Sequence, residues 1–237
     1  MGTDGAAGKI KNPLKGVRVV GKTRPIGEMA YVSLKKAIVK GDLHPEQRLV
    51  ESALSAQMGI SRIPVREAIK KLEQDGLVEK LEKGGFIVKN PSRKEIEETF
   101  GIRACIESYA AALATGHMDA PTIDRLENVL ALYREALERR DIAKMTQLND
   151  QLDEIIFNTS GSRKLYALIA NFRDFISRYR KVLLTCMDYA AISLSDHEKI
   201  VQAMKERDGE RVEKLMRKHL LRGRDILIKD MESGKEM

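Results

Sequence analysis

Helical periodicity with no strand pattern extends from about residue 93 to residue 231, and this feature constrains the fold more than any other. Gly116, Asp141 and Gly161 lie between the periodic segments, where residues of these types end or begin helices. A domain made of such segments must bury its apolar stripes between helices. We therefore predict an all-α helical bundle over residues 92–232. Its expected helices are 92–115, 121–139, 142–159, 163–187, 196–207 and 210–231.

Two Ser/Glu pairs in this region, Ser92 with Glu95 and Ser195 with Glu198, have the spacing of a capping box. In that motif each side chain accepts a hydrogen bond from the backbone at the start of a helix. We expect a helix to begin at each pair. Because Pro91 interrupts the chain just before the first pair, we place the domain boundary there.

The sequence before Pro91 predicts a different domain. Gly59 separates two short helical patterns, and Ser61 is a suitable N-cap for the second of them. Two strand-like segments follow, joined by residues that include two glycines able to adopt positive φ. This order is typical of a winged helix-turn-helix, expected over residues 25–90, in a chain that is mainly α. The predicted elements are a flexible basic tail (1–24), helices at 27–40, 51–58 and 61–74, a turn at 42–48, and wing strands at 77–81 and 86–89.

Positive charge is concentrated in the same N-terminal part. Residues 1–92 contain 12 Lys and 5 Arg against 3 Asp and 7 Glu, and so carry the whole net charge of +7. Residues 93–237 contain 25 basic and 25 acidic residues. A basic domain joined to a neutral one indicates a polyanion-binding head. A solvated lysine-rich face explains the charge alone equally well.

The helix that follows Ser61 divides into two faces. Val65, Ile69 and Leu72 fall on one side and are expected to pack inward. Arg62, Arg66 and Lys70 recur every fourth residue on another side. A recognition helix needs this division, because long cationic side chains near its N-terminus reach phosphates and guanine edges.

Export and membrane signals are not found in the sequence. No apolar run approaches the ~18 residues of a spanning helix, and residues 1–20 lack the apolar block of a secretory signal. We expect a cytoplasmic protein with no membrane partner. Cys105 and Cys186 are far apart in apolar helical patterns, so we interpret both as packing residues rather than as a disulfide or a zinc cluster.

The run Gly59-Ile60-Ser61-Arg62-Ile63-Pro64-Val65-Arg66-Glu67-Ala68-Ile69, followed by Leu72 to Val78, resembles the GntR superfamily of bacterial transcription regulators. The resemblance covers most of residues 30–90. It implies that Ser61, Arg62 and Arg66 contact operator DNA and that Lys83 and Gly84 lie at the wing tip near the minor groove. Two positions depart from the family: Ser52 stands where an Arg is common, and Glu46 where a Gly is usual.

Four polar residues of the bundle lie where core residues are expected. Asn149 and Asp153 share the apolar stripe of their helix, and His197 and His219 lie among apolar neighbours in theirs. Burying these groups is costly unless they satisfy one another or share a ligand. Their joint inward placement therefore indicates a site, although each alone is more simply a hydrogen-bonded core residue.

Residues 95–225 are similar to the FCD domain, the helical effector domain of the FadR branch of the superfamily. Arg103 with Glu107, the Ser160-Gly161 turn, Asp196-His197 and His219 carry this resemblance. It implies a homodimer, a small-molecule effector, and a divalent metal held at the positions of Asn149, Asp153, His197 and His219. Because an amide replaces a carboxylate and a carboxylate replaces an imidazole, two interpretations stay open. One is a weaker zinc or nickel site. The other is a metal-free site in which Asp153 bonds a histidine and Arg103, His197 and His219 hold an organic acid.

We therefore predict a DNA-binding transcription regulator rather than an enzyme, which binds double-stranded operator DNA as a homodimer. A repressor is expected, with an activator as the less common alternative. A metal-dependent helical enzyme with a nucleic-acid-binding head is the alternative, but no paired general acid and base and no Gly-rich phosphate loop accompany the polar residues. An RNA-binding protein is a third hypothesis. Tyr31 and Phe86 are the two aromatic residues of positions 1–92, too few for a reader that stacks bases.

Overall fold

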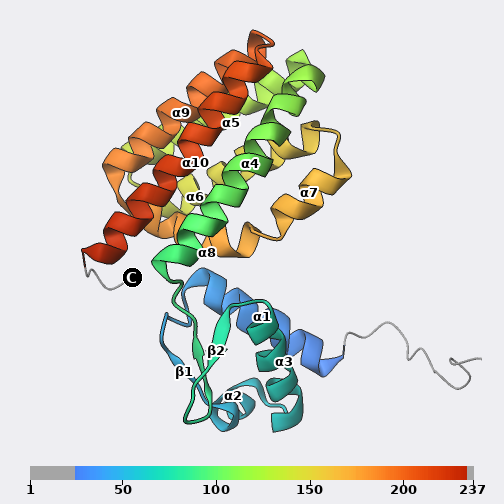
Figure 1. Cartoon of the computed structure of the whole chain (residues 1–237), viewed down its shortest axis with the longest axis vertical. Helices are drawn as coiled ribbons and strands as arrows, with labels where there is room; N and C mark the ends of the chain where they lie inside the picture. Colours follow the sequence, from blue (N-terminus) through green and yellow to red (C-terminus); the bar gives the residue numbers. More distant parts are fainter. Residues whose placement is uncertain (1–24, 234–237) are drawn as a thin grey trace, which may run out of the picture.

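A computed structural model describes residues 25–233, which form a small head and a larger helical body joined end to end (Figure 1). The head comprises residues 25–91 and the body residues 92–233, and each has its own hydrophobic cluster. The described residues contain ten helices and one three-stranded sheet, so the prediction of a mainly α chain is confirmed. The predicted tail at 1–24 lies outside the described residues.

Three helices form the apolar centre of the head. Leu34 and Ile38 of the first helix pack with Val65 and Ile69 of the third, all of them buried. Gly41 and Gly59 end the first two helices with φ of 82° and 65°, in the left-handed region that glycine adopts at little cost. The helices are α1 (Ile26–Lys40), α2 (Glu51–Met58) and α3 (Arg62–Gln74).

The sheet of the head has the antiparallel order β1-β3-β2. Strands β2 (Val78–Lys80) and β3 (Phe86–Val88) form the predicted hairpin. Strand β1 (Arg48–Leu49) pairs with β3 and was not predicted, since these residues follow a turn and only two of them are extended. The Leu49 side chain of β1 is buried in the head. This burial stabilises the short strand although the sequence has no strand pattern there.

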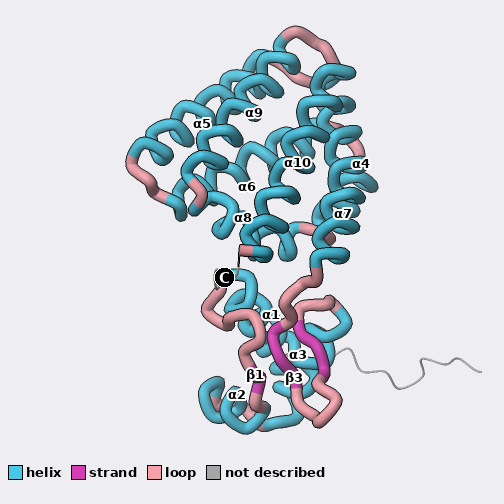
Figure 2. The backbone as a smooth tube through the Cα atoms, turned by 60° about the vertical axis from the view of Figure 1, so that its left-hand side comes forward, coloured by secondary structure: helices cyan, strands magenta, loops and turns pink. Residues whose placement is uncertain are grey.

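The connection between β2 and β3 is a tight loop in which Gly84 and Gly85 have φ of 85° and 93°. The backbone N–H of Leu81 donates to the carbonyl of Gly85, which closes the loop. This wing loop and α2 lie at the end of the head remote from the body (Figure 2). The predicted use of two glycines at positive φ is confirmed.

Glu46 also has a positive φ, 63°, in the turn before β1. The left-handed region costs a residue with a side chain about 1–2 kcal/mol, and glycine avoids this cost. Glu46, which stands where the family resemblance implies a glycine, therefore adds local strain without changing the path of the turn.

The body is a bundle of seven helices among the described residues. Helices α4 and α10 pack side by side (Figures 1 and 2). The predicted capping box of Ser92 and Glu95 is present at the start of α4, with both of its hydrogen bonds. None of the described helices has the length and apolar character needed to cross a membrane. The helices are α4 (Arg93–His117), α5 (Ala120–Glu138), α6 (Ile142–Thr159), α7 (Arg163–Ala170), α8 (Arg173–Thr185), α9 (Met187–Lys205) and α10 (Gly209–Glu232).

Three expectations about the body were wrong. The helix predicted at 163–187 is broken at Asn171 and Phe172 into α7 and α8, so that Ile169 and Ile176 can both reach the core. Helix α9 begins at Met187 and runs through Ser195, because packing of its apolar stripe outweighs the Ser195/Glu198 capping pattern. Cys105 and Cys186 are exposed rather than packed.

Candidate functional site

Helix α3 has the two faces that the sequence predicts. Val65, Ile69 and Leu72 are fully buried against the rest of the head. Arg62, Arg66 and Lys70 are exposed on the opposite side, each one helical turn from the next. The buried stripe therefore fixes the helix while its cationic face lies open to a ligand.

The start of α3 leaves its backbone donors available. Ser61 occupies the N-cap position as predicted, but its side chain makes no capping hydrogen bond. The first N–H groups of a helix lack partners within the helix and carry a partial positive charge. With an exposed Ser61 hydroxyl beside them, they form an arrangement suited to a phosphate group.

Glu51 is a neighbour of the recognition face that sequence reasoning missed. Its two carboxylate oxygens accept from Nε and Nη2 of Arg66 at 2.9 and 2.7 Å. These hydrogen bonds lower the pKa of Glu51. Because Glu51 belongs to α2, no local signal in the sequence predicts the pairing. The guanidinium of Arg66 is thus oriented by α2 before any ligand arrives.

The wing carries the other two predicted contacts. Lys83 is exposed at the loop, and Gly84 follows it. Arg48 of β1, a residue that the sequence analysis did not single out, donates from Nη2 to the carbonyl of Gly84 at 3.4 Å. The wing tip is therefore tied to β1, and its position relative to α3 is set by the sheet.

The body contains the polar cluster that the sequence predicts. Asn149, His197 and His219 are all buried. The Nε2 atom of His197 lies 3.2 Å from Oδ1 of Asn149, and the two imidazole rings lie 4.5 Å apart between centroids. On the far side of the pair, Nδ1 of His219 lies 3.5 Å from Oδ2 of Asp196. Three of the four predicted residues therefore form one contiguous group.

Asp153, the fourth predicted residue, faces a different partner. Its Oδ2 accepts from Nη2 of Arg180 at 2.6 Å, and the same guanidinium bonds Asp150. Burial raises the pKa of Asp153, but Arg180, His197 and Arg103 together outweigh burial and lower this pKa overall. Arg180 is buried on α8 and was missed by sequence reasoning, because its neighbours in sequence are also basic and suggest a solvated face.

This donor set does not fit a divalent metal. Among residues 25–233 no group of three or more His, Cys, Asp or Glu side chains could hold a metal ion. The carboxylate of Asp153 is occupied by a guanidinium, whose charge opposes a cation beside it. Burial, with a further contribution from His219, lowers the pKa of His197 to about 3, so this ring is neutral at neutral pH. Arg180 supplies the positive charge that a metal would bring.

Two small cavities flank this guanidinium. One, of about 30 Å³, is lined by Arg180, Asn149 and His219, and the other, of about 210 Å³, by Arg180 and Asp153. Arg103 borders both, and its guanidinium is paired with Glu107 at 2.6 and 3.0 Å. The buried Nδ1 of His197 has no hydrogen-bond partner. The two cavities offer the guanidinium groups of Arg180 and Arg103 to a polar ligand, whereas His197 lines neither cavity.

Comparisons with known proteins agree with both parts of the chain. The FCD domain family matches residues 98–222, and the gntR family of bacterial regulatory proteins matches residues 26–88. The uncharacterized HTH-type transcriptional regulator YdhC of Bacillus subtilis (strain 168) is 28% identical over 91% of this chain and 96% of its own length. The HTH-type transcriptional repressor RspR of Escherichia coli (strain K12) is 28% identical over 84% of this chain and 87% of its own length.

The solved structure of E. coli McbR/YncC has the same fold, with a TM-score of 0.70 and 21% identity, over 88% of this chain and 100% of that one. By their names YdhC and McbR are HTH-type transcriptional regulators, and RspR is an HTH-type transcriptional repressor.

Proposed function

Because the chain belongs to the gntR family of bacterial regulatory proteins and carries an FCD domain, we propose that it is a homodimeric repressor of transcription that binds operator DNA through its head and a small organic acid through its body. Repression is supported by the relative RspR, which is a repressor. The exposed cationic face of α3, its open N-terminus and the wing support binding to double-stranded DNA in the cytoplasm.

The pairing of Arg180 with Asp153 is the observation that carries the proposal for the body. A guanidinium binds a carboxylate through two parallel hydrogen bonds, and a carboxylate ligand can make the same bonds that Asp153 and Asp150 make. An organic acid that enters the adjoining cavity therefore exchanges one carboxylate for another at Arg180. Arg103, on the wall of the same cavity, lies in reach of a second acidic group.

Helix α8 connects this exchange to the head. Arg180 faces the core, whereas Arg178 and Tyr179 line cavities between body and head, and α8 contacts α1. A ligand shifts the head only if it binds one arrangement of α8 better than another. Replacement of the Asp153 contact by a ligand provides that difference, because the contact exists in one state and not in the other.

Dimerisation is supported by an apolar stripe on α4. Ile102 and Tyr109 are each 50% exposed, and the exposed Cys105 lies between them at helical spacing. Large apolar side chains in a row on a helix face are typical of a surface that a second protein covers. A second copy on this face would place two heads on two half-sites.

The test of the metal-free core is a titration of chelator-treated protein with zinc or nickel while the melting temperature is followed. A ligand that binds only the folded state raises this temperature. We expect no saturable rise in the wild type. The double variant Asp153→His with Arg180→Met removes the guanidinium and adds a third imidazole, and should gain such a rise.

The matched control is Asp153→Asn with Arg180→Met, which removes the same charges without adding an imidazole and should not respond to metal. A saturable rise in the wild type, or stoichiometric metal in the purified protein, contradicts the metal-free core. In that case Arg180 would pair with Asp153 only when no metal is bound.

A further inference from the structure

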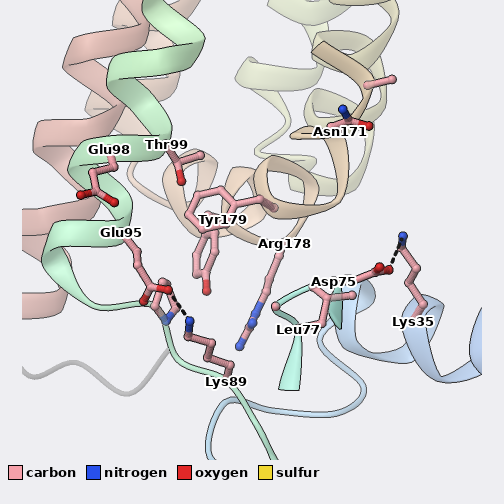
Figure 3. Close-up of a pocket in the computed structure, with 14 residues that line it drawn as sticks. Lys35, Asp75, Leu77, Lys89, Glu95, Glu98, Thr99, Asn171, Arg178 and Tyr179 are labelled. Atoms are coloured by element: carbon pink, nitrogen blue, oxygen red, sulfur yellow. Dashed lines mark hydrogen bonds and ion pairs between the residues drawn. The ribbon is translucent and has the colours of Figure 1, made fainter. Parts of the chain in front are cut away.

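A cavity of about 540 Å³ lies between head and body (Figure 3). Its walls come from both parts: Leu77 and Lys89 belong to the head, and Thr99, Arg178 and Tyr179 to the body. None of the core residues discussed above lines it. A ligand here would contact both parts of the molecule at once.

Arg178 is the unusual residue of this cavity. It is half-buried, its Nη2 atom is fully buried without a hydrogen-bond partner, and within the part of the chain that the structure describes it has no ion pair. Burial lowers the pKa of its guanidinium. An unpaired charge removed from water is costly unless something compensates it.

The carboxylates around the cavity do not provide that compensation. Asp75 pairs with Lys35 at 3.3 Å, and Glu95 pairs with Lys89. Glu98 lies 3.8 Å from Lys94. Each acidic group on the wall thus has a lysine of its own. Among residues 25–233 the guanidinium of Arg178 lies over the Tyr179 ring, 5.3 Å from its centroid, but it has no carboxylate partner, so an anion can still bind to it.

Tyr179 adds a second donor beside Arg178. It is 2% exposed, and its hydroxyl is buried with no hydrogen-bond partner. Figure 3 shows both side chains extending from α8 toward the head, into the space above Lys89. Two adjacent donors without acceptors are an arrangement that an anion satisfies.

An apolar chamber adjoins these donors. A cavity of about 840 Å³ shares Arg178 and Tyr179 with the first, and its walls include Ile38 and Leu43 of the head and Val182 of the body. A ligand held by its anionic group at Arg178 can therefore extend an apolar part between α1 and α8. This combination of a few polar groups with an apolar wall is usual for small-molecule sites.

We propose that the junction of head and body is a second ligand site, separate from the core, and that it takes a small organic carboxylate with an apolar body. The carboxylate accepts from Arg178 and from the Tyr179 hydroxyl, while the apolar part packs against Val39, Leu43 and Val182. Because the ligand contacts both α1 and α8, its binding favours one orientation of the head. This inference goes beyond the proposed core site and does not depend on it.

The test uses benzoate as the probe, with acetate and chloride at the same ionic strength, and follows the melting temperature of the full chain without DNA. Benzoate should raise the melting temperature saturably, and acetate should do so less because it lacks the apolar part. Arg178→Met should abolish the rise. In chloride alone this variant should be about as stable as the wild type, because it removes a half-buried charge that has no ion pair.

Two further variants keep the result decisive. Arg163→Met, on the exposed start of α7, is the matched control and should respond to benzoate as the wild type does. Tyr179→Phe keeps the buried ring and removes the donor, so it should weaken the benzoate response even if Arg178→Met does not fold.

An equal benzoate rise in wild type and Arg178→Met, or no rise in the wild type, overturns the proposal. A chain that ends at Ser233 separates the sources of the carboxylate, since it lacks the side chain of Glu236. If only this shortened chain responds, the chain's own carboxylate fills the site and the proposal of a free ligand is wrong.

Discussion

Arg66 shows how one side chain on the recognition face is prepared for its contact. In the free protein its guanidinium lies in a bidentate contact with Glu51 of α2. Such a contact restricts the rotamers of a long side chain, so less conformational entropy is lost when it binds a base or a phosphate. The sequence indicates the exposed cation, but its partner becomes known only when α2 and α3 are packed together.

Arg66→Ala should weaken binding to operator DNA by roughly tenfold to hundredfold if the side chain makes a bidentate base contact. Arg62→Ala should act in the same direction. Both side chains are exposed, so neither change should unfold the head. A gel-shift titration measures the effect, with Arg139→Ala on the body surface as the control. Equal affinity of all three variants and the wild type would remove α3 from the interface.

His197 should make the stability of the body depend on pH. The pKa of an unfolded histidine is about 6.5, and burial lowers that of His197 to about 3 in the folded chain. Between these values the unfolded chain binds one more proton, so the free energy of unfolding falls as the pH decreases from about 6.5 toward 3. Above the unfolded pKa, His197 contributes no pH dependence.

Urea unfolding at pH 7.5 and 5.5 measures this contribution when wild type and His197→Asn are compared. Over this interval the wild type should lose about 1.4 kcal/mol more than the variant. The other histidines are present in both proteins and cancel in the comparison. An identical loss in both proteins would show that His197 is not buried in its neutral form.

The residues that sequence patterns predict well are those whose own helix gives the signal. Asn149, His197 and His219 interrupt apolar stripes, and all three are buried. Arg180 could not be predicted in this way, because its burial depends on Asp153 in another helix. An ion pair formed by tertiary contact leaves no periodic trace in either helix.

At the scale of elements, the break between α7 and α8 matters most. No Pro or Gly marks it, and the break follows from packing, since Ile169 and Ile176 are both buried. Because α8 is a separate helix, Arg180 lies at a cavity of the core while Arg178 lies at the cavity between body and head. Helix caps and glycine turns were predictable from local chemistry, whereas this break and the early start of α9 are set by the whole bundle.

The exposed stripe of α4 should hold two copies of the chain together. The double variant Ile102→Glu with Tyr109→Glu places charges on that stripe and should sediment as a folded monomer, because burying an unpaired carboxylate is costly. Leu168→Glu on α7 is the matched control, since Leu168 is equally exposed at 50% and lies on another helix. A double variant that remains dimeric would place the interface elsewhere.

At the scale of the whole molecule, the head and the body differ in charge, as expected if the head binds DNA and the body binds a small ligand. The excess positive charge lies in residues 1–92, and the body is neutral overall with its ionic groups arranged in internal pairs such as Arg103 with Glu107. The architecture could be predicted because it depends on periodicity and breakers within each segment. The relation of head to body could not, since it depends on contacts between α1 and α8 that neither segment encodes alone.

Selection of genomic DNA fragments by the purified protein, in chelator, with and without a pool of small organic acids, tests the central claim most directly. The account predicts that a few near-palindromic duplex fragments are enriched, and that the acids change this enrichment while the chelator is present. Absence of specific enrichment would contradict operator binding. A response to the acids that appears only after zinc or nickel is restored would contradict the metal-free core.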